Sequence, residues 1–338
     1  MPRINYENLK EEVWDTGKCS GCGACCAVCP ACAIVFSESD NKQPVNTGYC
    51  KDLSDSVKCG ACYSVCPGTN AAEKKRELLG EYIAIKAAKS SAEIPNKQSG
   101  GAVTAILAAA LEKGIIDAVV TVSHDSWTKK PQSVLITSKE ALTTSAGSRY
   151  SWWTPVLMAL SEAVVKKKCR NIAVVATPCA VSALRLMKES ENDLVMPFGK
   201  AVRLIFGLFC TEVFDYQKLT QGKLKSQLNI NSWDIERMDI KGKFEVNLND
   251  GTIVNIPLDE LEDAVRPGCR ICTDLSAADS DISAGSVGSP KGYTTLIIRN
   301  STGLGFFENA VKAGFIEVSD DTDISRIRAL AEKKSFGK

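Results

Sequence analysis

One stretch near the N-terminus, a run of cysteines closed by a proline, constrains this chain more than any other feature. The run has the form C-x2-C-x2-C-x3-C-P and comprises Cys19, Cys22, Cys25, Cys29 and Pro30. In two-cluster ferredoxins the first three cysteines of such a run bind one [4Fe–4S] cluster, and the fourth crosses to the other cluster. Zinc motifs seldom place three cysteines at this spacing before a fourth that precedes proline. The run therefore predicts a small iron–sulfur domain.

A second, incomplete run follows at Cys59, Cys62, Cys66 and Pro67. Ser56 stands where its first cysteine would be, so one ligand is missing, and Cys50 is the nearest upstream candidate. The predicted ligands are Cys19, Cys22, Cys25 and Cys66 for one cluster, and Cys29, Cys50, Cys59 and Cys62 for the other. A [3Fe–4S] second cluster, or ligation by Cys32 in place of Cys50, is left open.

Composition narrows the class of protein. The chain has 338 residues, 15 cysteines, a single histidine and a net charge of +1. Residues 1–15 are charged and lack the apolar segment of a secretory signal, so we expect a cytoplasmic protein whose clustered cysteines bind metal. The near-zero net charge gives no field to attract nucleic acid. Since no apolar run is long enough to span a bilayer, any membrane association would pass through a partner.

Beyond residue 100 the sequence alternates between helical and strand-like segments. Apolar strands are predicted at 115–123, 134–137, 171–177, 202–210 and 293–299, and helices at 102–113, 154–168, 181–188 and 306–313. A hairpin is predicted at 244–256 around Asn249-Asp250-Gly251. Strands alternating with helices indicate an α/β (α+β) domain. We therefore expect a ferredoxin-type domain over 1–75 and a larger α/β domain over 76–338, with a linker or boundary helix at 73–79 between them.

Five cysteines lie in this larger domain. Cys179 and Cys210 each follow a predicted strand, and Cys269 and Cys272 form a C-x2-C pair. Because strand ends converge on one edge of an α/β sheet, these four thiols could hold a third cluster. Buried structural cysteines are an equally good reading of the spacing alone. Cys169 follows three lysines and has no partner motif.

From residue 99 to about 313 the chain resembles a known family, the beta subunits of coenzyme F420-reducing hydrogenase and F420H2 dehydrogenase. The matching segments are SGGAVT (99–104), AGSRY (146–150), TPCA (177–180), GLFC (207–210), KGKF (241–244), GCRICTD (268–274) and ADSDISAGSVGSP (278–290). The resemblance implies the α/β fold of that family. It also implies that Cys179, Cys210, Cys269 and Cys272 hold a third [4Fe–4S] cluster beside FAD.

The resemblance further implies an oxidoreductase subunit that passes a hydride between F420 and FAD, and single electrons through three clusters to a larger redox complex. A flavin is needed between the deazaflavin and the clusters because it exchanges both hydrides and single electrons. No side-chain acid or nucleophile is required. The expected location is cytoplasmic or peripheral to a membrane complex. A flavin-free electron carrier or adaptor and a zinc-rich scaffold are the competing interpretations.

Candidate cofactor contacts follow from the matching segments. They are Ser99, Gly100, Gly101, Gly147, Arg149, Tyr150, Thr177, Pro178, Gly285, Ser286, Gly288, Ser289, Lys291 and Gly292. Glycines allow the backbone to approach cofactor rings and phosphates closely, although turns explain single glycines equally well. Candidates for binding the anionic F420 tail are Lys129, Lys130, Arg149, Lys291 and Arg299, each of which could instead be a solvated surface charge. The chain lacks a G-x-G-x-x-G fingerprint after a strand, so the sequence gives no support for a nicotinamide site.

Overall fold

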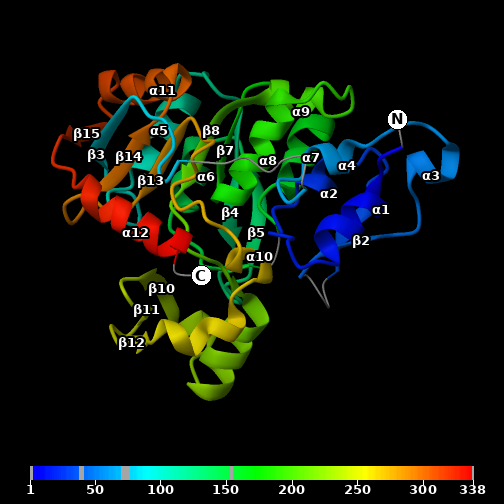
Figure 1. Ribbon diagram of the computed structural model, residues 1–338. Helices are drawn as coiled ribbons and strands as arrows, with labels where there is room; N and C mark the ends of the chain where they lie inside the picture. The colour runs from blue at the N-terminus through cyan, green and yellow to red at the C-terminus, as the bar shows by residue number, and fades with distance from the viewer. Residues whose placement is uncertain (1–2, 38–41, 70–76, 153–154, 337–338) are drawn as a thin grey trace.

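The computed structural model describes residues 3–37, 42–69, 77–152 and 155–336 (Figure 1). Three parts can be followed in the figure: the cysteine-rich N-terminal segment, a large sheet covered by helices, and a small β lobe beside them. The predicted α/β architecture is confirmed. The predicted boundary helix at 73–79 falls mostly outside the described residues. Among the described helices, none is long and apolar enough to cross a membrane.

The large sheet has eight strands in the order β15-β3-β14-β13-β8-β7-β4-β5. Their bounds are β3 Ala84–Ser90, β4 Ala118–His124, β5 Pro131–Ile136, β7 Ile172–Ala176, β8 Val202–Leu208, β13 Ile282–Gly285, β14 Thr294–Ile298 and β15 Ile316–Ser319. Strands β4, β7, β8 and β13 are mutually parallel, and the remaining pairs are antiparallel. The carboxyl ends of the four parallel strands therefore lie on one edge of the sheet, where α/β proteins place their ligands.

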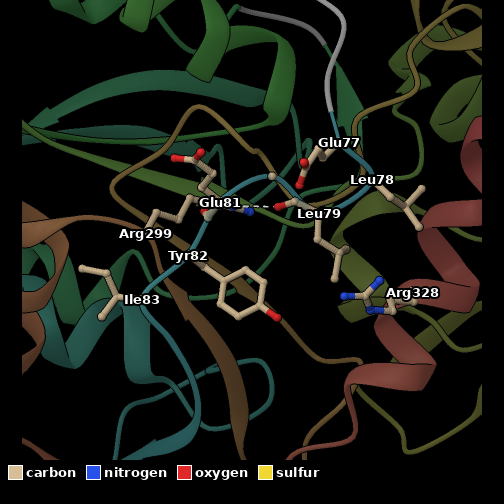
Figure 2. A pocket seen from close by; sticks show the side chains of 9 residues that line it. Glu77, Leu78, Leu79, Glu81, Tyr82, Ile83, Arg299 and Arg328 are labelled. Carbon is tan, nitrogen blue, oxygen red and sulfur yellow. Dashed lines mark hydrogen bonds between the residues drawn. The ribbon is translucent and has the colours of Figure 1, made fainter.

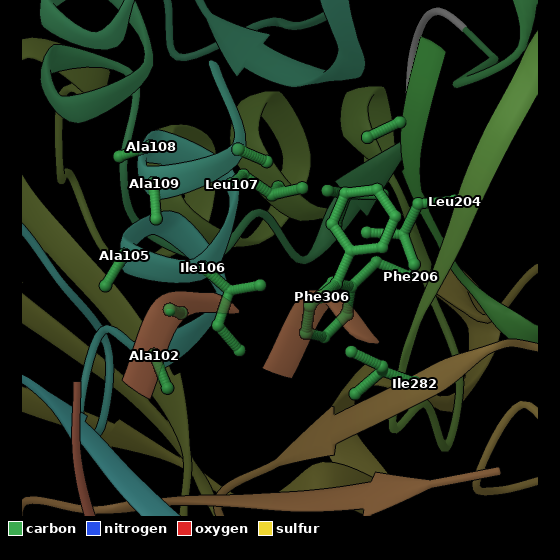
Figure 3. Close-up of a cluster of buried hydrophobic side chains, with 14 of the residues drawn as sticks. Ala102, Ala105, Ile106, Leu107, Ala108, Ala109, Leu204, Phe206, Ile282 and Phe306 are labelled. Atoms are coloured by element: carbon green, nitrogen blue, oxygen red, sulfur yellow. The ribbon is translucent and has the colours of Figure 1, made fainter. Parts of the chain in front are cut away.

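Helices cover both faces of this sheet because its central strands are apolar on both sides; β7 is buried along its whole length. On one face α5 (Ala102–Glu112) and α11 (Ser301–Lys312) pack in a core with Phe206 and Ile282, which Figure 3 shows. On the other face α8 (Pro178–Glu189), α9 (Met196–Ala201) and α7 (Met158–Ser161) form a second core.

The N-terminal segment packs against this second core. Its elements are α1 (Tyr6–Leu9), η1 (Lys10–Trp14), α2 (Ala24–Val28), β1 (Ile34–Phe36), β2 (Pro44–Asn46), α3 (Lys51–Asp55) and α4 (Ala61–Ser64). Ala24, Ala27 and Val28 of α2 are buried in one cluster with Leu157 and Leu184. The Leu157 N–H also donates to the Cys22 carbonyl at 3.1 Å. These contacts place the N-terminal cysteines against the helices of the large sheet.

The small lobe has its own core. It comprises η4 (Gln217–Gln227), η5 (Ser232–Asp234), η6 (Leu258–Ala264) and the antiparallel strands β10 (Ile235–Ile240), β11 (Phe244–Leu248) and β12 (Ile253–Ile256). The predicted hairpin over 244–256 is confirmed by the pairing of β11 with β12. Phe214, Leu219 and Phe244 are completely buried in this lobe. The short strands β6 (Ser151–Trp152) and β9 (Phe214–Asp215) pair in parallel and connect the lobe to the large sheet.

Candidate functional site

The ten cysteines of the N-terminal segment include two groups of neighbouring thiols. Burial raises the pKa of the Cys22 thiol, and Cys179, Cys66 and Cys25 raise it further. Burial likewise raises the pKa of Cys66, with Cys25 and Cys19 among its thiol neighbours. The first group is therefore Cys19, Cys22, Cys25 and Cys66, which are the four predicted ligands of one cluster.

The second group lies around Cys62. Burial raises the pKa of its thiol, as do Cys25, Cys59, Cys29 and Cys50. The same second group surrounds Cys59, where burial is again the largest effect and Cys50 and Cys29 add to it. Cys50 precedes α3 and thus lies with the second run, as the ligand prediction requires. Cys32, the alternative ligand, is exposed.

The third group assembles at the carboxyl edge of the large sheet. Cys179 lies in the first turn of α8, directly after β7, and Cys210 comes shortly after β8. Cys269 belongs to the short helix α10 (Pro267–Arg270), and Cys272 follows it. Burial raises the pKa of Cys210, Lys334 lowers it, and Cys269, Cys179 and Cys272 raise it. Burial also raises the pKa of Cys269 to about 11, with Cys179 again a neighbour.

The chemistry of these groups fits iron–sulfur clusters. Each group offers four cysteine thiols, which is the ligand set of a [4Fe–4S] cluster. A cavity is lined by Cys19, Cys22, Cys25 and Cys66 together with the loop that carries the first run. Within the described residues, no group of three or more His, Cys, Asp or Glu side chains is arranged to hold a single metal ion.

The three thiol groups lie in a row. Cys22 of the first group neighbours Cys179 of the third, and Cys25 neighbours Cys62 of the second. The backbones of the first and third groups are in close contact. A Cβ on Gly268, which precedes Cys269, would lie only 2.5 Å from the Cys19 carbonyl oxygen. The row thus runs from the edge of the large sheet into the N-terminal segment.

Three loops lie side by side at the same edge, next to the third group. The Phe214 N–H donates to the Tyr150 carbonyl at 3.0 Å, and the Tyr216 hydroxyl donates to the Thr128 carbonyl at 2.5 Å. Residues 125–130, 146–152 and 210–216 are joined in this way. Thr177 directly follows β7 at this edge, and its Oγ1 lies 3.4 Å from the Cys179 Sγ. The predicted contacts Gly147, Arg149 and Tyr150 therefore lie on one of the joined loops, and Thr177 and Pro178 lie beside the third thiol group.

Arg149, on the loop of residues 146–152, is the centre of a half-buried basic group. Burial lowers the pKa of its guanidinium to about 10. Burial, followed by Arg149 and Lys129, lowers the pKa of His124 to about 4, which makes this imidazole neutral at pH 7. Arg149 Nε and His124 Nδ1 are buried and have no hydrogen-bond partner among the residues that the structure describes. Two unpartnered polar atoms next to two cations suit an anionic ligand group.

The remaining candidates have other environments. A Cβ on Gly100 would lie 2.4 Å from the Ala88 carbonyl oxygen, and one on Gly288 would lie 2.6 Å from Ile327, so packing explains both glycines. Ser99 and Gly101, which lie just before α5, have positive φ. A Cβ on Gly285 would lie 2.0 Å from the Phe209 ring, which precedes Cys210.

The turn between β13 and β14 holds the last predicted contacts. Ser286, Lys291 and Gly292 are exposed there, and the Ser289 hydroxyl donates to the Tyr293 carbonyl at 3.1 Å. This turn follows the carboxyl end of β13, so it lies on the same edge of the sheet as the third thiol group but two strands away from β7.

Arg299 does not belong to the site, which corrects its proposed role in binding the tail. It follows β14, whose end pairs with the beginning of β13 at the opposite edge of the sheet. Its buried guanidinium donates to Ser283, Ser276 and the carbonyls of Leu79 and Glu81. It also lines a cavity of about 660 Å3 formed mainly by residues 77–83 (Figure 2). None of the thiols or glycine loops described above lines this cavity.

Two residues of the site were not found from the sequence. The Gln98 side chain accepts from the Ser148 N–H at 2.8 Å and donates to the Met238 carbonyl at 2.9 Å, so it ties the Arg149 loop to the small lobe. Its position directly before Ser99 was the available signal. Lys334 reaches the third thiol group from the C-terminal helix, and no sequence pattern indicates this.

Comparison with known proteins decides the family, which is described as "Coenzyme F420 hydrogenase/dehydrogenase, beta subunit". Residues 85–161 match the model of its N-terminal part, and residues 169–324 match the model of its C-terminal part. The chain belongs to this family. The matched residues include the third thiol group and the Arg149 loop, whereas the first and second thiol groups lie before them.

Relatives in the family are named for F420. A subunit of the F420H2 dehydrogenase of Methanosarcina mazei is 32% identical over 91% of this chain and 85% of its own length. An uncharacterised protein of Methanocaldococcus jannaschii is 42% identical over 98% of this chain and 97% of its own length. A chain in a structure of the F420-reducing [NiFe] hydrogenase complex from Methanosarcina barkeri has a TM-score of 0.71 and 29% identity, covering 78% of this chain and 92% of that one. The predicted family and its fold are confirmed.

Proposed function

We propose that the chain is an F420-linked oxidoreductase subunit that passes electrons between F420 and a partner in a larger complex, with FAD and three [4Fe–4S] clusters bound. The observation that carries this proposal is the row of three thiol groups beginning at the sheet edge where the family's cofactor loops gather. A thiol of the first group neighbours a thiol of the third, and another thiol of the first group neighbours one of the second. A one-electron path through the protein needs such a row.

FAD, when bound, exchanges a hydride with the deazaflavin and single electrons with the clusters. The residues of the chain bind and orient the cofactors. Arg149 and Lys129 supply positive charge for a phosphate group, and neutral His124 supplies a ring nitrogen for a hydrogen bond. The position of Thr177 and Pro178 at the start of α8 adds the positive end of a helix dipole beside the third group.

Removal of the Arg149 charge should weaken cofactor binding. In Arg149→Met we expect the Kd for FAD or for F420 to rise by roughly tenfold to a hundredfold, because a charge-assisted hydrogen bond to a phosphate contributes about 1.5–3 kcal/mol. Fluorescence titration of each cofactor shows which of the two binds there. Arg170→Met is the matched control, since Arg170 is exposed at the opposite edge before β7. If Arg149→Met bound each of the two cofactors as tightly as the wild type does, Arg149 would not belong to the proposed site.

An absorption spectrum combined with iron analysis tests the proposed cofactor set. Anaerobically prepared protein should contain about twelve iron and twelve sulfide per chain, as three four-iron clusters require, together with acid-extractable FAD. Clusters without flavin would favour the alternative, an adaptor without catalytic activity. A colourless protein containing zinc would overturn the proposal.

The far end of the row of thiol groups indicates where a partner protein would exchange electrons with the chain. Cys50 and Cys59 of the second thiol group, at the other end of the row from the large sheet, are each only partly buried. We propose that electrons enter or leave here, to or from a partner protein of the complex. Any contact with a membrane would be made through that partner.

A further inference from the structure

We propose that the Lys334 ammonium group raises the reduction potential of the third cluster, which makes it a better electron acceptor for the flavin. This inference rests on the proposed cluster at Cys179, Cys210, Cys269 and Cys272. It concerns a residue beyond the part of the chain matched to the family, which ends at residue 324.

Lys334 lies near the end of α12 (Ile324–Phe336) and is only 5% exposed. Its Nζ donates to the Cys210 carbonyl at 2.5 Å and to the Asp274 carbonyl at 2.7 Å. One acceptor thus belongs to a predicted ligand, and the other lies two residues after Cys272. The next residue, Ser335, donates through its hydroxyl to the Thr273 carbonyl at 3.1 Å.

The helix holds this ammonium group in place. Ile327 and Ala331 of α12 are fully buried with Leu79 and Leu275 in one apolar cluster. Leu275 also accepts the Cys210 N–H at 2.9 Å through its carbonyl. The lysine is therefore fixed relative to the loops that carry Cys210 and Cys272.

A buried ammonium group needs a negative partner, because its desolvation costs more than two carbonyl hydrogen bonds return. The side chains that interact with it electrostatically are Cys210, Cys272, Asp274 and Cys179. Three of these are predicted ligands, and Asp274 is also held by the Ala278 N–H at 3.0 Å. A cluster with four thiolates adds its negative charge to that of the Asp274 carboxylate.

The direction of the expected shift in reduction potential follows from the positive charge of the Lys334 ammonium group. Reduction by one electron adds one negative charge to the cluster, and a fixed cation nearby stabilises the reduced form more than the oxidised form. Charge and hydrogen bonds near the sulfurs are established determinants of cluster potentials. Loss of the ammonium charge should therefore lower the potential.

The test is an EPR-monitored redox titration of the full chain with its cofactors. In Lys334→Gln, which keeps a donor but loses the charge, we expect one cluster potential to fall by about 59 mV or more, a tenfold change in the one-electron equilibrium constant. The other two potentials should not move. Lys334→Arg should keep most of the wild-type value, and Lys333→Gln, which removes a neighbouring exposed charge, should leave all three unchanged.

The outcomes separate this inference from the proposed function. Unchanged potentials in Lys334→Gln, with about twelve iron retained, would overturn the inference and leave the proposed function standing. Loss of about four iron in Lys334→Gln but not in Lys334→Arg would assign the residue to cluster assembly, and would also overturn it. A wild-type content of about eight iron would remove the third cluster and the inference together.

Discussion

Replacing Cys272 by serine should disconnect the cofactor site from the N-terminal clusters. Cys272 belongs to the third thiol group, so its loss should reduce the iron content from about twelve to about eight per chain and leave the other two clusters intact. Addition of F420H2 to the wild type should then produce the EPR signals of reduced N-terminal clusters. In Cys272→Ser these signals should appear with dithionite but not with F420H2.

Cys169→Ser is the matched control for this prediction. Cys169 lies before β7, at the opposite edge of the sheet from Cys179, and burial and Asp117 are what raise the pKa of its thiol. We expect it to keep all of the iron and the response to F420H2. Normal reduction of the N-terminal clusters in Cys272→Ser, or a lost cluster in Cys169→Ser, would show that the proposed ligand groups are wrong.

The N-terminal thiol groups were predictable from the sequence because a C-x2-C-x2-C run places three thiols on one short loop. Cys50 was harder, since eight residues separate it from Cys59 and only folding through α3 brings the two together. The third group could not be derived from spacing. Its members come from the ends of two strands and from a short helix some sixty residues later, and only the family resemblance joined them.

The main strands were predicted where β-branched residues form apolar runs, as in β7 and β8. The strand β3 was missed because its sequence, AIKAAKS, contains mostly alanine and lysine. It forms because Ala87 and Ala88 are fully buried between β14 and β15, so tertiary packing overrides a weak strand propensity. The predicted helix over 154–168 is in fact α7 followed by η3 (Glu162–Lys166), a π-helical turn that local periodicity does not reveal.

Lys334 illustrates a limit of motif-based reasoning. Its helix is amphipathic and reads as a surface helix, and a lysine near its end suits the helix dipole without any further role. Only the packing of Ile327 and Ala331 turns this lysine inward toward Cys210. A charge that acts on a cofactor from a distant element has no local signature.

The choice of electron donor tests the central claim most directly. Protein reconstituted with iron, sulfide and FAD is mixed with a viologen dye and with F420H2, NADH or NADPH in separate reactions. The basic group at Arg149 and membership of the coenzyme F420 hydrogenase/dehydrogenase beta-subunit family support a deazaflavin, whereas the sequence lacks a nicotinamide fingerprint. The account predicts rapid dye reduction with F420H2 and negligible reduction with either nicotinamide. Reduction by NADH or NADPH without reduction by F420H2 would contradict it.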